Sequence, residues 1–116
     1  MGWDDAQTTR VTARPELMNA AGHLSGVIAF TLIDYGMGSA LWPHTTEAEG
    51  IATINISISY LRRAQPGGEL VCRSKLDRRT RATAALRSEV VQEETGEVVA
   101  TAIGTYAIFP GTKTAR

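Results

Sequence analysis

The sequence predicts an α+β domain in which an antiparallel sheet wraps around one long buried helix. The first observation is a stretch, residues 24–41, that is apolar on most sides of a helix. The second is that four later segments alternate between apolar and polar residues, with the period of two that half-buried strands require. The third is length, since 116 residues suffice for a single domain, residues 1–116, with one core.

Residues 8–14 form the first expected strand. They read TTRVTAR, which is polar with β-branched positions, and Pro15 stiffens the chain directly after them. This composition is typical of an edge strand. Residues 19–23 contain turn formers and are expected to make a loop before the helix.

The expected helix spans residues 24–41. Ser25 is a candidate N-cap, and the Trp-Pro pair after Leu41 provides a stop. Gly36 and Gly38 lower the helix propensity, so we expect either a close approach to the backbone there or an irregular end.

Four strands are expected after the helix, within residues 53–60, 70–76, 82–92 and 98–109. In the first of them, the even positions from Ile54 to Tyr60 are apolar and the odd positions are polar. Turns are expected at 66–68, 78–81 and 95–96. Because the connections are short, the four strands should form an antiparallel meander in sequence order.

The open side of the helix predicts self-association. A sheet that curls around a helix still leaves one side uncovered, and a second copy of the chain is the natural cover. The twelve Lys and Arg residues balance the twelve Asp and Glu residues, which removes charge repulsion between copies. The same balance argues against a nucleic-acid binder that depends on phosphate neutralisation.

Several other classes are excluded by composition. The single cysteine, Cys72, allows no internal disulfide and no cysteine-based zinc site, and it is expected to be a small core residue. His23 and His44 are far apart, so a metal site is not expected. No leader-like segment opens the chain, and Asp34 interrupts the longest apolar stretch. We therefore expect a soluble, cytoplasmic domain without a membrane partner.

Two features of the helix point to chemistry. Asp34 is either a carboxylate on an exposed stripe or a partly desolvated base or nucleophile, and its apolar neighbours favour the second. At the helix start, Gly26 is either a simple entry residue or a backbone N–H donor for an oxyanion. The two lie eight residues, or about 12 Å, apart along a helix. Both can act on one reacting group only if they come from different subunits.

These residues also resemble a known family. The run Asn19-x-x-Gly22-x-Leu24-Ser25-Gly26, followed by Asp34 and the segment ATINISISYLRRA, is similar to the hotdog-fold acyl-CoA thioesterases of the PaaI type. The resemblance covers residues 18–109. It implies a hotdog fold, assembly as homodimers and often homotetramers, and hydrolysis of an acyl-CoA or acyl-carrier thioester. No cofactor is implied beyond coenzyme A as part of the substrate.

The resemblance also implies roles for individual residues. Asp34 matches the carboxylate that activates water or attacks the thioester, and Gly26 matches the backbone donor to the thioester carbonyl. Asn19 matches a side chain that helps to place the carbonyl or the water. Thr53 falls where relatives carry a hydroxyl that hydrogen-bonds the carboxylate or the water.

The sequence departs from the family pattern at three positions. Ser25 stands where relatives carry histidine, Val27 where they carry a second glycine, and Arg63 where they carry proline. His23 is the only histidine near the missing imidazole. Besides a thioesterase, the sequence therefore leaves open a non-catalytic acyl-thioester binder, a hotdog dehydratase or hydratase, and a purely structural dimerisation module.

Arginines gather at the expected strand ends and turns. Because guanidinium groups suit phosphates, they are candidate contacts for coenzyme A, although solvated turn charges are the simpler explanation. The candidate substrate-binding residues are Ser25, Arg62, Arg63, Arg79 and Arg81.

Overall fold

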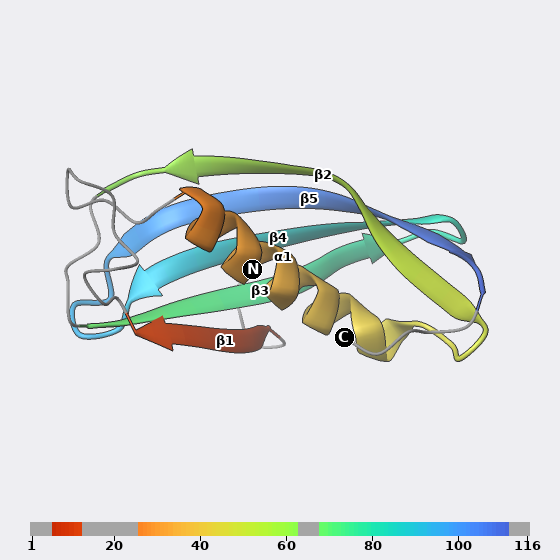
Figure 1. Cartoon of the computed structure of the whole chain (residues 1–116), viewed down its shortest axis with the longest axis horizontal. Coiled ribbons are helices and arrows are strands. Elements are labelled where there is room, and N and C mark those ends of the chain that lie inside the picture. The colour runs from red at the N-terminus through yellow and green to blue at the C-terminus, as the bar shows by residue number, and fades with distance from the viewer. Residues whose placement is uncertain (1–5, 13–25, 63–67, 112–116) are drawn as a thin grey trace.

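The computed structural model describes residues 6–12, 26–62 and 68–111 of the chain. One long helix lies across one face of an antiparallel sheet, which confirms the predicted fold class (Figure 1). The elements are β1 (Gln7–Thr12), α1 (Gly26–Leu41), the short 3-10 helix η2 (Trp42–His44), β2 (Glu49–Tyr60), β3 (Glu69–Arg79), β4 (Thr83–Gln92) and β5 (Val98–Pro110).

The strand order is β1-β3-β4-β5-β2, with every pair antiparallel. The predicted meander of the last four strands is therefore wrong in one respect: β3, β4 and β5 are consecutive neighbours, but β2 pairs with β5 at the far edge (Figure 1). The link between β2 and β3, residues 61–68, is long enough for this crossover. Three strand spacings amount to about 14 Å, whereas eight extended residues reach about 26 Å.

The two remaining connections are tight, as predicted. In the β4–β5 turn, Gly96 has a φ of 73°, a left-handed conformation that favours glycine, and its N–H donates to the Gln92 carbonyl. The β3–β4 connection is shorter than expected because β3 continues to Arg79. Thr80 closes it, since its hydroxyl accepts a hydrogen bond of 3.0 Å from the Thr83 N–H.

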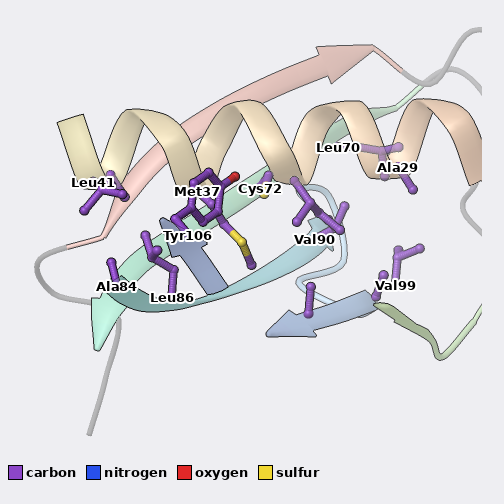
Figure 2. Packing of buried hydrophobic residues seen from close by; sticks show 14 of the residues in the cluster. Ala29, Met37, Leu41, Leu70, Cys72, Ala84, Leu86, Val90, Val99 and Tyr106 are labelled. Carbon is purple, nitrogen blue, oxygen red and sulfur yellow. The ribbon is translucent and has the colours of Figure 1, made fainter. Parts of the chain in front are cut away.

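The core lies between α1 and the sheet. The helix buries Ala29, Ile33, Met37, Ala40 and Leu41 and packs chiefly against β3, with β1 and β4 also in contact. Figure 2 shows Ala29, Met37 and Leu41 of the helix above side chains of β3, β4 and β5. Cys72 is one of the core residues, as expected, and burial raises the pKa of its thiol.

Gly36 marks a close approach between helix and sheet, which is one of the two outcomes expected for the helix glycines. A Cβ atom on Gly36 would lie 2.6 Å from the Ser74 Oγ of β3. Ser74 is fully buried, and its hydroxyl is 2.7 Å from that of Ser88 on β4. The helix therefore sits directly on a buried pair of serines, and only glycine leaves room for it.

Part of the apolar surface stays exposed in the single chain. Phe30 and Tyr35 on α1 are 43% and 55% exposed, so the helix does have an open side. On β2, Ile56 and Ile58 pack against the core, but Ile54 is 58% exposed. The even residues of this strand therefore do not all face the core, contrary to the simple alternation.

Within the described residues, no helix is long and apolar enough to cross a membrane.

Candidate active site

Asp34 lies in the middle of α1 and is half-buried. Its Oδ1 atom accepts a hydrogen bond of 2.7 Å from the Thr53 hydroxyl and one of 2.5 Å from the Tyr106 hydroxyl. The Tyr106 hydroxyl is also 3.0 Å from the backbone carbonyl oxygen of Asp34. Asp34 is thus a half-buried carboxylate that two hydroxyl groups hold, rather than a freely solvated charge.

A β-bulge in β2 directs Thr53 toward the helix. The register between β2 and β5 shifts between Thr53 and Asn55, so Ile54 is the extra residue and points outward. Without the bulge, Thr53 and Ile56 would lie on opposite faces of the strand, because side chains alternate. With it, Thr53 pairs with Tyr106 and Ile56 with Gly104, and both face α1. The hydrogen bond between Thr53 and Asp34 is the contact that the family resemblance implies.

Tyr106 is a site residue that the sequence analysis missed. It rises from β5 into the core, is 2% exposed, and points toward α1 (Figure 2). The sequence does contain a signal for it. The even-numbered residues of β5 face the core, and a buried tyrosine hydroxyl needs a hydrogen-bond partner. Asp34, the carboxylate of the buried helix, was an available acceptor.

Gly26 is the first residue of α1, so its N–H has no acceptor within the helix. Gly26 and Asp34 lie on one continuous helix, about 12 Å apart along its axis, as the sequence predicts. One chain therefore cannot bring both to the same reacting group. The predicted residues Asn19, Ser25 and Arg63 lie outside the described residues.

The predicted arginines do not form one cluster. Arg62 follows β2, whose last residue Tyr60 pairs with Ala100 of β5. Arg79 pairs with Ala84 of β4, which in turn pairs with Tyr106. Arg62 therefore lies near Ala100 along β5, and Arg79 lies near Tyr106. From Ala100 to Tyr106 the strand advances by six residues, or about 20 Å, so Arg62 and Arg79 of one chain cannot hold the same phosphate.

Two of these arginines have protein partners. Arg62 forms an ion pair of 2.6 Å with Glu97, with both side chains about half exposed. Arg79 forms an ion pair of 2.6 Å with Glu49 and also donates to the His44 carbonyl oxygen. The Arg79 guanidinium beside Glu49 lowers the pKa of that carboxyl group.

Arg79 thus joins β3 to the start of β2 and to η2. A second register shift, between Leu76 and Arg78, places Arg79 on the helix-facing side of the sheet, opposite Ala84. Arg81, in contrast, is exposed in the β3–β4 turn.

In the described parts of the chain, no group of three or more His, Cys, Asp or Glu side chains is placed to hold a metal ion.

The chain is similar to known proteins in both sequence and fold. The sequence profile of the thioesterase superfamily matches residues 21–99. No curated protein sequence matches the chain significantly.

Solved structures share the fold at low sequence identity. A thioesterase from Haemophilus influenzae is 16% identical, with a TM-score of 0.83 over 95% of this chain and 75% of that one. The PaaI protein of the phenylacetic acid degradation operon of Escherichia coli is 19% identical, with a TM-score of 0.81 over 95% of this chain and 77% of that one. A Bacillus halodurans protein solved with CoA is 20% identical, with a TM-score of 0.81 over 88% of this chain and 66% of that one.

Proposed function

Because the chain belongs to the thioesterase superfamily, we propose that it is an acyl-CoA thioesterase with a site formed between two subunits. It hydrolyses a small or medium acyl thioester, aliphatic or aromatic, to the free acid and CoA. The observation that carries this proposal is the half-buried Asp34 carboxylate, which two hydroxyl groups hold in place. Such a carboxylate can act on a thioester without a metal or redox cofactor, because the acyl group is already activated.

In the proposed reaction, Asp34 of one subunit acts as general base or as nucleophile. As a base, it takes a proton from water while the water oxygen bonds to the thioester carbon. The C–S bond then breaks, and the proton passes to the departing CoA thiolate. The Gly26 N–H of the other subunit donates to the carbonyl oxygen as negative charge develops there, and Asn19 assists. Thr53 holds the carboxylate.

The position of β2 at an edge of the sheet supports the proposal of a shared site. Among the described strands, β2 lies at an edge and pairs only with β5, so one row of its backbone groups is available to another strand. Exposed apolar side chains follow the same edge, with Tyr60 51% and Leu61 56% exposed. We propose a homodimer in which two β2 strands meet, and a homotetramer as a further level of assembly.

The coenzyme A part of the substrate is proposed from two considerations. One structural neighbour, the Bacillus halodurans protein, was solved with CoA. In this chain, the candidate contacts remain Ser25, Arg63, Arg81 and Arg62, which would exchange a half-exposed ion pair with Glu97 for a phosphate. Arg79 would have to leave both the less exposed Glu49 and the His44 carbonyl. We therefore place Arg79 last among these candidates.

The decisive experiment is a panel of acyl-CoA thioesters scored by the release of free thiol. Wild-type protein should release thiol from at least one of them, and Asp34→Asn should lose about a hundredfold or more in kcat. Asp77→Asn is the matched control, because it makes the same change in an exposed residue on β3. Equal activity of Asp34→Asn and wild type would exclude Asp34 from the reaction.

A second candidate function is a non-catalytic acyl-thioester binder. Ser25, in the place of the family histidine, is the observation that favours it. In the same panel, measurable binding of an acyl-CoA without any thiol release would support the binder and contradict hydrolysis.

A further inference from the structure

We propose that Tyr106 is a positioning residue which, together with Thr53, anchors Oδ1 of Asp34 and leaves Oδ2 as the oxygen that reacts. This inference rests on the proposed function and adds to it at the level of single atoms. It names a residue on β5 that acts through Asp34 rather than on the substrate.

The two hydroxyl groups bind the same carboxylate oxygen. Thr53 and Tyr106 lie opposite each other on neighbouring strands, and each donates to Oδ1. A carboxylate oxygen with two donors has its lone pairs largely occupied. In the described part of the chain, no hydrogen-bond donor is placed on Oδ2. The two oxygens are therefore not equivalent, although the free carboxylate would be symmetric.

Tyr106 is the more rigid of the two donors. Thr53 is exposed, so its hydroxyl borders solvent, whereas Tyr106 is part of the core cluster and 2% exposed. Its hydroxyl also lies 3.0 Å from the backbone carbonyl oxygen of Asp34. The phenol therefore contacts both the side chain and the main chain of one residue, which fixes the carboxylate relative to the helix axis. Close packing around the ring prevents the hydroxyl from following the carboxylate elsewhere.

The anchor fixes the orientation of the Asp34 carboxylate for the proposed reaction. Hydrogen bonds to an ionised group are about twice as strong as neutral ones, so rotation of Asp34 away from both hydroxyls is costly. With Oδ1 anchored, Oδ2 keeps its lone pairs and the larger share of accessible negative charge. If Asp34 is a base, Oδ2 is then the atom that takes the proton from water. If Asp34 is a nucleophile, Oδ2 bonds to the thioester carbon while the C–S bond breaks and CoA leaves as the thiolate, and water then hydrolyses the resulting anhydride to the free acid and the Asp34 carboxylate.

Tyr106→Phe removes the anchor and keeps the ring. We expect kcat to fall about tenfold to a hundredfold, the range for loss of a hydrogen bond to a charged group. KM should stay within about twofold, because the substrate does not touch Tyr106 and uniform binding is unchanged. Tyr35→Phe is the matched control, since it removes the same atom from the exposed neighbour of Asp34. A Tyr106→Phe variant with the wild-type kcat, alongside an inactive Asp34→Asn, would overturn the inference and leave the proposed function standing.

Thr53 offers a second test that does not depend on a core substitution. Thr53→Val should lower kcat, and Thr53→Ser, which restores the hydroxyl, should recover it. Equal kcat in Thr53→Val and wild type would overturn the two-donor anchor, even if Tyr106→Phe failed to fold.

Crystal structures of wild type and Tyr106→Phe give a readout that is independent of activity. Wild type should show one Asp34 rotamer with both hydroxyls on one oxygen, and Tyr106→Phe should show a rotated or divided carboxylate. An unchanged single rotamer in the variant would contradict the anchoring role. A wild-type protein that releases no thiol from any thioester would instead overturn the proposed function, and with it the reactive role of Oδ2.

Discussion

The separation of Gly26 and Asp34 on one helix leads to a complementation experiment. Each site of the proposed dimer takes Asp34 from one subunit and the Gly26 N–H from the other, because about 12 Å of helix separates them and a reacting group must lie about 3 Å from both. Two variants, each inactive alone, should therefore restore activity when they are mixed. The two variants are Asp34→Asn, which removes the carboxylate, and Gly26→Pro, which removes the N–H.

Gly26→Pro is a suitable change because Gly26 is the first helical residue. Proline is favoured at the first helical position, because the N–H that it removes there has no acceptor in the helix. Helix α1 should therefore still form. Loss of one oxyanion donor lowers kcat by about a hundredfold to a thousandfold. Both parent proteins should therefore have at most about 1% of the wild-type activity.

The expected recovery follows from the two-fold symmetry of the dimer. Random reassociation of equal amounts gives one heterodimer for every two dimers, and each heterodimer has one intact site out of two. Thiol release by the unseparated mixture should therefore return to roughly one quarter of the wild-type rate, about 25 times the rate of either parent, and that of the isolated heterodimer to about one half. The subunits can be exchanged by co-expression with two different affinity tags, and the heterodimer isolated by tandem purification. Purified heterodimer with no more activity than its parents would refute the shared site.

Two further predictions concern the scaffold that holds the site. Gly36→Ala should lower the free energy of unfolding by about 1–3 kcal/mol, because its Cβ would lie 2.6 Å from the Ser74 Oγ and overpacking outweighs a gain in helix propensity of about 1 kcal/mol. In denaturant titrations, the added substitution Ser74→Ala should remove part of that loss. Strictly additive effects of the two substitutions would contradict the close contact. Arg79 lowers the pKa of Glu49 in the folded protein, so the Glu49–Arg79 pair should stabilise the fold fully at pH values above 4.5, the ordinary pKa of glutamate, and lose that effect as the pH falls through the lowered pKa. The difference in free energy of unfolding between wild type and Glu49→Gln should therefore shrink over that acid range. A difference that stays constant with pH would argue against the pair.

The elements of this fold were predictable because their signals are local. The apolar stretch before Leu41 and the glycine turn at Gly96 each depend on neighbours in sequence. The pairing of β2 with β5 was not predictable from connection length, since residues 61–68 can make either a hairpin or a crossover. A single sequence does not indicate whether such a link joins neighbouring strands or crosses to the far edge of the sheet.

The candidate site was predictable only in part, for a related reason. Asp34 is conspicuous because a carboxylate within an apolar helix is unusual, and the family resemblance adds Thr53. The direction of Thr53, however, depends on a bulge at Ile54, and alternation alone would place Thr53 on the wrong face. Likewise, a second register shift turns Arg79 toward His44 and Glu49. Its guanidinium, a candidate phosphate contact in the sequence, therefore binds the backbone and a carboxylate of its own chain.

The spacing between α1 and the sheet connects the core to the reaction. Gly36 allows the helix to rest on Ser74, and a Cβ on Gly104 of β5 would lie 2.5 Å from the Met37 Sδ. Gly104 is two residues from Tyr106 on the same face, and Met37 is one helical turn from Asp34. A Cβ at Gly36 would press the helix away from Ser74 on β3, and a Cβ at Gly104 would displace the Met37 side chain that lies between β5 and the helix. Since a hydrogen bond weakens as its atoms separate, a larger spacing between α1 and the sheet would be expected to weaken the 2.5 Å contact between Tyr106 and Asp34. We therefore expect these two glycines to influence how firmly Asp34, the proposed reactive carboxylate, is held.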